Sequence, residues 1–139
     1  MIKEVVNNWN KNKNKLEMYL SKTKQEEYSD YEDLLKVVVK IILPEFDYKN
    51  IRTNEFGEYQ GINIFLIPTS IYPSLEEIII THNYYGSCCG CDTLEYIKTA
   101  SSNYGDGLPT KKQVGLYMQL CLNLIENMQQ LKSIELNDK

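Results

Sequence analysis

The first third of the chain alternates apolar and polar positions with the period of an α-helix. From Ile2 to Leu20, apolar side chains recur every three or four residues, with Lys and Asn between them. Because this apolar stripe lapses at Asn12 and Lys13, we expect the first helix to be frayed or divided there. A second stripe, from Leu34 to Ile42, predicts a helix that ends before Pro44.

The middle of the chain changes to the pattern of β-strands. We expect a short strand over residues 48–53, a turn over Asn54–Gly57, and a strand over Ile62–Ile67 that is apolar on both faces. A further strand is predicted over Glu77–Tyr84. Together these segments predict an antiparallel sheet of about three strands.

Three capping-box patterns mark expected helix starts: Ser29–Glu32, Asp92–Glu95 and Thr110–Gln113. After the third, apolar residues keep the helical period as far as Leu131, which predicts a closing helix of about five turns. A second apolar row within residues 116–122 indicates that this helix is buried on more than one side or contacts another chain. A homodimer is therefore one expectation.

These elements predict one α+β domain over residues 1–139. Residues 1–45 form its helical N-terminal part, with two helices. Residues 46–139 hold the sheet, a cysteine-rich turn with a short helix after it, and the long C-terminal helix. A small sheet needs a helix on one face to be stable, and we expect the closing helix to cover it.

Composition and charge narrow the function classes. The chain has 42% hydrophobic and 24% charged residues, as expected for a soluble protein, and 15 basic against 19 acidic residues give a net charge of −4. Arg52 is its single arginine, which disfavours a nucleic-acid reader. Neither a membrane-spanning apolar run nor a signal-peptide core is apparent, so we expect a cytoplasmic protein that does not enter membranes.

Three of the four cysteines, Cys88, Cys89 and Cys91, lie within four positions between the last strand and the helix that starts at Asp92. One interpretation is a zinc site. Cys88 and Cys91 have the spacing that lets one turn present two thiolates, and His82 is the one histidine available to extend the ligand set. No second cysteine pair is present, so the alternative of no cofactor stays open.

A second interpretation of the same turn is thiol redox chemistry. A helix start favours the thiolate form, although thioredoxin-like enzymes have a parallel strand–helix–strand context that is not predicted here. A third interpretation is a tight turn whose small cysteines are buried and inert. His82 could serve Ser87 or Cys88 as a base, yet no acid is evidently placed to orient it. The sequence therefore favours a binding protein over an enzyme.

The candidate binding residues lie in the same turn: Tyr85, Ser87 and Asp92. Tyrosine offers a large rigid surface with a polar tip, which suits an interface. Ser87 stands among glycines whose backbone N–H groups could face an anion at the helix start, while Asp92 opens that helix.

Several motifs resemble those of a group of small uncharacterised phage and prophage proteins of Gram-positive bacteria. The central motif is Tyr-Gly-Ser-Cys-x-Gly-Cys-Asp, here residues 85–92, in which the relatives typically carry Ser where this chain has Cys89. The other shared features are Glu58–Gly61 before an apolar strand ending at Pro68, Tyr72–Ser74, and Pro109–Thr110 opening the last helix. The resemblance spans about residues 47–131.

The resemblance implies a phage setting, in which small proteins without an enzymatic motif often bind and inhibit a host protein. We therefore expect a protein that inhibits or sequesters a bacterial target, such as an anti-CRISPR or another antidefence factor. The alternatives are the zinc or thiol-redox protein that uses Cys88 and Cys91, and a sponge for a signalling nucleotide with aromatic residues stacking on the base.

Overall fold

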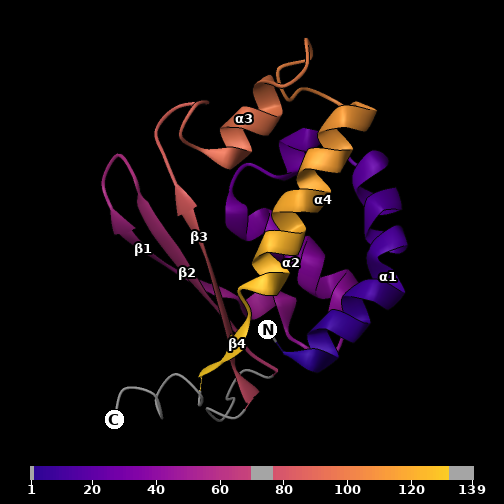
Figure 1. The fold of residues 1–139 in the computed structure, drawn as a ribbon, viewed down its shortest axis with the longest axis vertical. Coiled ribbons are helices and arrows are strands. Elements are labelled where there is room, and N and C mark those ends of the chain that lie inside the picture. The colour runs from indigo at the N-terminus through magenta and orange to yellow at the C-terminus, as the bar shows by residue number, and fades with distance from the viewer. Residues whose placement is uncertain (1, 70–76, 132–139) are drawn as a thin grey trace.

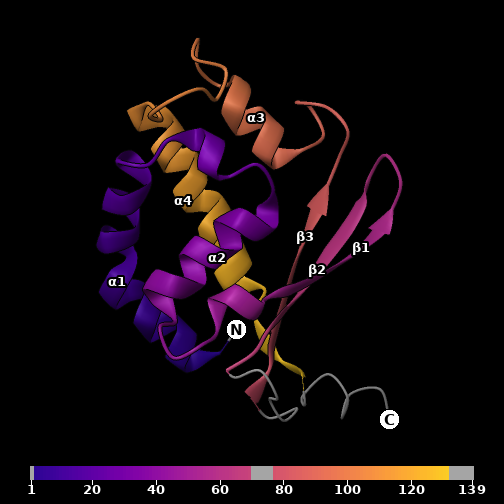
Figure 2. The same ribbon diagram turned by 180° about the vertical axis from the view of Figure 1, so that it is seen from behind.

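The chain is described by a computed structural model that covers residues 2–69 and 77–131. Its helices lie on one side of an antiparallel sheet, as Figures 1 and 2 show from opposite directions. The helices are α1 (Lys3–Ser21), α2 (Tyr31–Ile42), α3 (Thr93–Thr99) and α4 (Lys111–Glu126), with 3₁₀ turns η1 (Gln25–Glu27) and η2 (Tyr48–Asn50). The strands are β1 (Arg52–Gly57), β2 (Gly61–Ile67), β3 (Ile79–Tyr85) and β4 (Gln129–Gln130), in the order β1-β2-β3-β4.

This arrangement confirms an α+β fold with two N-terminal helices, a small antiparallel sheet and a long C-terminal helix. The closing helix is shorter than its apolar pattern predicts, since α4 ends at Glu126 rather than near Leu131. After Met128, which is fully buried, the chain pairs Gln129 and Gln130 with β3. Because the helix ends early, the residues after it form the fourth strand, β4, which was not predicted from the sequence.

Helix α1 is continuous, so the prediction of a break at Asn12 and Lys13 is wrong. Its buried residues, Val5, Trp9, Leu16 and Leu20, cluster near its two ends and pack against α2 and α4. The polar middle of the helix faces solvent. Once both ends are held in the core, continuing the helical hydrogen bonds across the middle costs less than breaking and restarting them.

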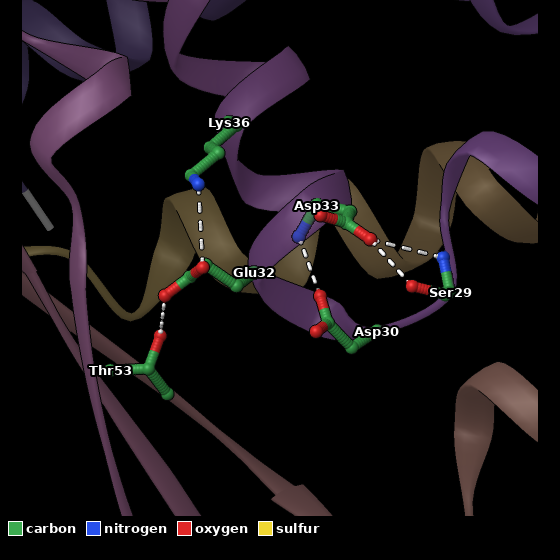
Figure 3. A network of polar contacts seen from close by, with 6 residues as sticks. All are labelled: Ser29, Asp30, Glu32, Asp33, Lys36 and Thr53. Atoms are coloured by element: carbon green, nitrogen blue, oxygen red, sulfur yellow. Dashed lines mark hydrogen bonds and ion pairs between the residues drawn. The ribbon is translucent and has the colours of Figure 1, made fainter.

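The N-cap of α2 lies one residue later than the predicted Ser29–Glu32 box. The side chain of Asp30 accepts a hydrogen bond from the backbone N–H of Asp33 at 2.8 Å (Figure 3). In return, the Asp33 carboxylate accepts from the hydroxyl of Ser29 at 2.8 Å and from its N–H at 3.2 Å. An aspartate cap places a negative charge at the positive end of the helix dipole, which favours Asp30 over the neutral Ser29.

The predicted turn over Asn54–Gly57 is also wrong, because these residues belong to strand β1. Each of them pairs with β2, ending with Gly57 opposite Gly61. The true turn is Glu58–Gln60, and Gly57 introduces it with a φ of 125°, a conformation that side-chain-bearing residues rarely adopt. The predicted helix starts at Asp92 and Thr110 are confirmed, and Thr110 forms a complete capping box with Gln113.

The core lies between the helices and the inner face of the sheet. Its largest fully buried side chains come from every layer: Tyr28, Leu34, Leu35, Phe65, Ile67, Tyr117 and Leu124. Strand β2 is central, and its two faces differ. Asn63, Phe65 and Ile67 face the helices and are buried, whereas the alternate residues are half-buried on the outer face.

Candidate functional site

A cleft of about 510 Å³ lies between the inner face of the sheet and the first turns of α2 and α3. Glu55 of β1 and Asn63 of β2 lie opposite each other in the strand register and both line it, and Asn83 of β3 stands next to Asn63 in the same row. Asn63 lines the cleft although it is 8% exposed, and its amide donates to Asn83 across 3.4 Å. This polar row was missed from the sequence because it exists only once the three strands are aligned.

Tyr85 forms the next part of the cleft wall. It lies opposite Gly61, where an added Cβ would collide with the Phe56 carbonyl oxygen and approach the tyrosine hydroxyl to 2.8 Å, so the glycine leaves room for both groups. The buried hydroxyl makes no hydrogen bond within the described residues. Burial, together with the neighbouring Glu55 carboxylate, raises the pKa of Tyr85, which keeps the phenol protonated.

Asp92 also lines the cleft, but its carboxylate is already occupied by the fold. It is 7% exposed and accepts hydrogen bonds from the Tyr31 hydroxyl at 2.8 Å, and from the backbone N–H groups of Gly86 and Glu95, each at 3.0 Å. These bonds tie together the end of β3 and the starts of α2 and α3. Asp92 therefore shapes the site rather than offering a free ligand group.

The cleft is acidic. Five carboxylates line it: Asp30, Glu32, Glu55, Asp92 and Glu95. Its described lining residues include neither Lys nor Arg. Glu32 is held by the Thr53 hydroxyl and by Lys36, whose Nζ lies 3.4 Å away (Figure 3). Ser87 lines the same cleft and is exposed. The structure thus gathers the predicted binding residues Tyr85, Ser87 and Asp92, but in surroundings that repel a phosphate rather than attract it.

The cysteine turn stands above the cleft with its thiols in solvent. Cys88, Cys89 and Cys91 are exposed, so the interpretation of this turn as one with buried cysteines is wrong. The Cys88 carbonyl accepts hydrogen bonds from the N–H groups of Cys91 at 3.1 Å and Asp92 at 2.9 Å. This compact turn brings the Sγ atoms of Cys88 and Cys91 to 2.7 Å.

His82 belongs to a different surface. It lies in the middle of β3, and its ring meets that of Tyr84 edge-on, with centroids 5.9 Å apart. Within residues 2–69 and 77–131 no group of three or more His, Cys, Asp and Glu side chains is placed to hold a metal. The structure therefore brings Cys88 and Cys91 together without His82.

The outer sheet face is the side of β1–β3 that points away from the helices. We use this name for the six apolar residues that share it: Phe56, Ile62, Ile64, Leu66, Ile80 and Tyr84. No described helix covers this side in Figures 1 and 2. Phe56 is 56% exposed and Tyr84 is 72% exposed, and the four aliphatic residues are half-buried.

The outer sheet face is also hollowed. A depression of about 110 Å³ lies on it, with Ile62, Ile64, Ile80 and His82 among its lining residues. The alternation of β2 could have shown that Ile62 and Ile64 share one face. The sequence did not show that this face stays uncovered, because that depends on all helices packing on the opposite side.

Comparison with known protein families, with curated proteins and with solved structures finds no match to this chain. The resemblance to phage and prophage proteins accordingly remains a prediction from sequence motifs. Within its described residues, the chain has no helix that is both long and apolar enough to cross a membrane.

Proposed function

We propose that this chain is a binding protein that inhibits or sequesters a target protein by laying its outer sheet face against it. The observation that carries the proposal is the apolar character of that face. Proteins rarely leave a contiguous apolar patch in water unless another molecule covers it. Here the patch runs across three paired strands from Phe56 to Tyr84, with aliphatic residues between the two aromatic rings.

The chemistry of this face suits a protein partner. Aromatic residues contribute large rigid contact areas and are frequent energetic centres of interfaces. Phe56, Ile62 and Tyr84 stand in one cross-strand row, and the depression beside Ile62 is suited to receive an apolar side chain. The partner surface is therefore expected to be apolar at its centre.

The resemblance to phage and prophage proteins supports a bacterial host protein as the target. A component of a defence system, such as a CRISPR effector, is the target class that this setting favours. The nucleotide sponge receives no support from the acidic cleft, whose carboxylates would repel phosphates.

Quantitative capture from lysate of a Gram-positive host tests the proposal. The bait is the full chain, and its variant carries Phe56→Ser with Tyr84→Ser. The matched control carries Tyr96→Ser with Tyr104→Ser, which removes two exposed aromatic rings elsewhere. Loss of two such anchors is expected to weaken a true target by at least about tenfold, whereas the control retains it.

Two results would overturn the proposal. One is that every captured host protein binds the outer-face variant as well as the wild type. The other is that light scattering finds a wild-type dimer which the outer-face variant converts to a monomer, since a second copy would then be the occupant. Circular dichroism of each variant confirms that it is folded before binding is compared.

A further inference from the structure

Beyond the proposed binding function, the cysteine turn carries chemistry of its own. We propose that Cys88 and Cys91 form a thiol–disulfide exchange site, whose substrate class is an accessible disulfide and whose product is an intramolecular Cys88–Cys91 disulfide. The inference rests on the position of the two thiols and does not depend on the outer sheet face.

The two sulfur atoms are already close to bonding distance. Their Sγ atoms are 2.7 Å apart, and a disulfide has a length of about 2.05 Å. The hydrogen bonds that the Cys88 carbonyl accepts from the N–H groups of Cys91 and Asp92 fix the turn that sets this approach. Small rotations of the side chains therefore suffice to close the bond.

The geometry distinguishes Cys91 as the attacking thiol. Its Sγ accepts a hydrogen bond from the backbone N–H of Cys88 at 3.1 Å, and it faces the Cys88 thiol. A hydrogen bond from the Cys88 thiol lowers the pKa of Cys91, and further hydrogen bonds from the backbone of Cys88 and from Ser87 lower it as well. Because the thiolate is the nucleophile in exchange, this environment favours attack by Cys91.

The exchange proceeds in two balanced steps. The Cys91 thiolate attacks one sulfur of a disulfide RSSR, forming a mixed disulfide and releasing RS⁻, which takes up a proton. The Cys88 thiol then loses its proton and attacks the Cys91 sulfur, which closes the Cys88–Cys91 bond and releases the second RS⁻. Two protein thiols are oxidised and one disulfide is reduced to two RSH molecules.

The other two cysteines lack these features. Cys89 is exposed, but the described residues place no second sulfur at hydrogen-bonding distance from it. Cys121 is fully buried in α4, and burial raises the pKa of its thiol. Both serve as controls within the same chain. Cys89 tests whether exposure alone makes a thiol reactive, and Cys121 is a thiol that solvent does not reach.

The test uses the full chain, reduced and then incubated with oxidised glutathione, with thiols counted by alkylation and mass spectrometry. The wild type and a Cys89→Ser variant are both expected to lose two thiols, with the linkage mapped to Cys88–Cys91. Made in the Cys89→Ser background, Cys88→Ser and Cys91→Ser cannot close this bond and instead accumulate a mixed disulfide with glutathione. At neutral pH, Cys91 in the Cys88→Ser variant should react several-fold faster than Cys88 in the Cys91→Ser variant, because the Cys91 sulfur keeps the hydrogen bond from the backbone N–H of residue 88.

The proposal is overturned if the wild type keeps all its thiols reduced, or if Cys89 takes part in the protein disulfide. It is also overturned if the purified protein carries stoichiometric zinc that the Cys88→Ser variant loses, because the thiols would then be ligands. A failure of exchange leaves the capture experiment untouched, since Phe56 and Tyr84 lie on another surface.

Discussion

The hydroxyl of Tyr31 donates a hydrogen bond to Oδ1 of Asp92 across 2.8 Å, and its oxygen accepts one from the N–H of Leu94 at 3.1 Å. Tyr31 is the first residue of α2, Asp92 is the N-cap of α3, and Leu94 lies in the first turn of α3. Burial raises the pKa of Tyr31, so the phenol keeps its proton and remains a donor. This contact positions the cysteine turn, because Asp92 is bonded in turn to Gly86.

Replacing Tyr31 with Phe is expected to destabilise the protein. The ring still fills its site, but the buried Asp92 carboxylate loses a donor and the Leu94 N–H loses its acceptor. Leaving such groups unpaired costs about 1–3 kcal/mol. Urea unfolding of Tyr31→Phe against wild type measures the loss. Tyr96→Phe removes the hydroxyl of a tyrosine that is 49% exposed, and it should change the free energy of unfolding by less than about 0.5 kcal/mol.

The features of the fold that were predicted correctly are those that depend on residues close together in the sequence. The capping box at Thr110 needs only Gln113 three residues later, and the spacing alone identified it. The same rule failed at Ser29, because Asp30 offers a stronger cap one residue on. Local patterns also overextended α4, since the pairing of Gln129 with Ile80 of β3 depends on residues far away in sequence.

The candidate site likewise has one part that was predicted from the sequence and one part that was not. Tyr85, Ser87 and Asp92 lie within eight positions of one turn, so a sequence motif keeps them together however the rest folds. Glu55 and Asn63 come from two other strands, and only the register of the sheet brings them into the cleft. The uncovered outer sheet face was not predictable either, because it results from where the helices pack.

Gln113 connects the first turn of α4 to its surroundings and is expected to be a stability centre. Its side chain is fully buried. The carbonyl oxygen accepts from the N–H of Thr110 and the amide of Asn103, both at 2.9 Å, and its amide donates to the Ile97 carbonyl at 3.1 Å. Gln113→Ala leaves these groups unpaired, at a cost of about 1–3 kcal/mol for each buried one.

Gln119 supplies the matched control on the same helix. It is exposed, and its amide bonds to the neighbouring Asn123 side chain at 3.1 Å. Gln119→Ala should therefore change the melting temperature little, while Gln113→Ala lowers it by several degrees, as expected for about 2 kcal/mol in a domain of this size. Equal melting temperatures for the two variants would contradict the central role of Gln113.

Two glycines of the cysteine turn should respond differently to alanine. A Cβ at Gly86 would lie 2.4 Å from the carbonyl oxygen and 2.6 Å from the Sγ of Cys91, whereas at Gly90 its nearest neighbour is the Cys88 Sγ at 4.0 Å. Gly86→Ala must therefore shift the turn and is expected to slow closure of the Cys88–Cys91 disulfide severalfold. Gly90→Ala should leave the rate near that of wild type. Thiol counting over time compares them, and a Gly86→Ala rate equal to wild type would contradict the steric argument.

Stability is expected to fall at alkaline pH because buried tyrosines resist ionisation. Tyr28 and Tyr117 pack edge-to-face with ring centroids 5.7 Å apart. Burial raises the pKa of Tyr28 to about 12 from its ordinary value of 10.0, and it also raises the pKa of Tyr117. The folded state thus holds protons that the unfolded state loses above about pH 10. The associated stability is fully present below that pH and is lost as the pH rises through about 12.

The variant Tyr28→Phe isolates the contribution of one phenol to this alkaline loss. The Tyr28 hydroxyl is buried and makes no hydrogen bond within the described residues, so the variant should be at least as stable as wild type near pH 7. Above about pH 10 the wild type should lose about 1.4 kcal/mol per pH unit more than the variant, because only its unfolded chain releases that proton. Urea unfolding at intervals between about pH 7 and pH 11 measures both slopes. Parallel pH dependences would show that Tyr28 ionises equally easily in the folded and unfolded chain.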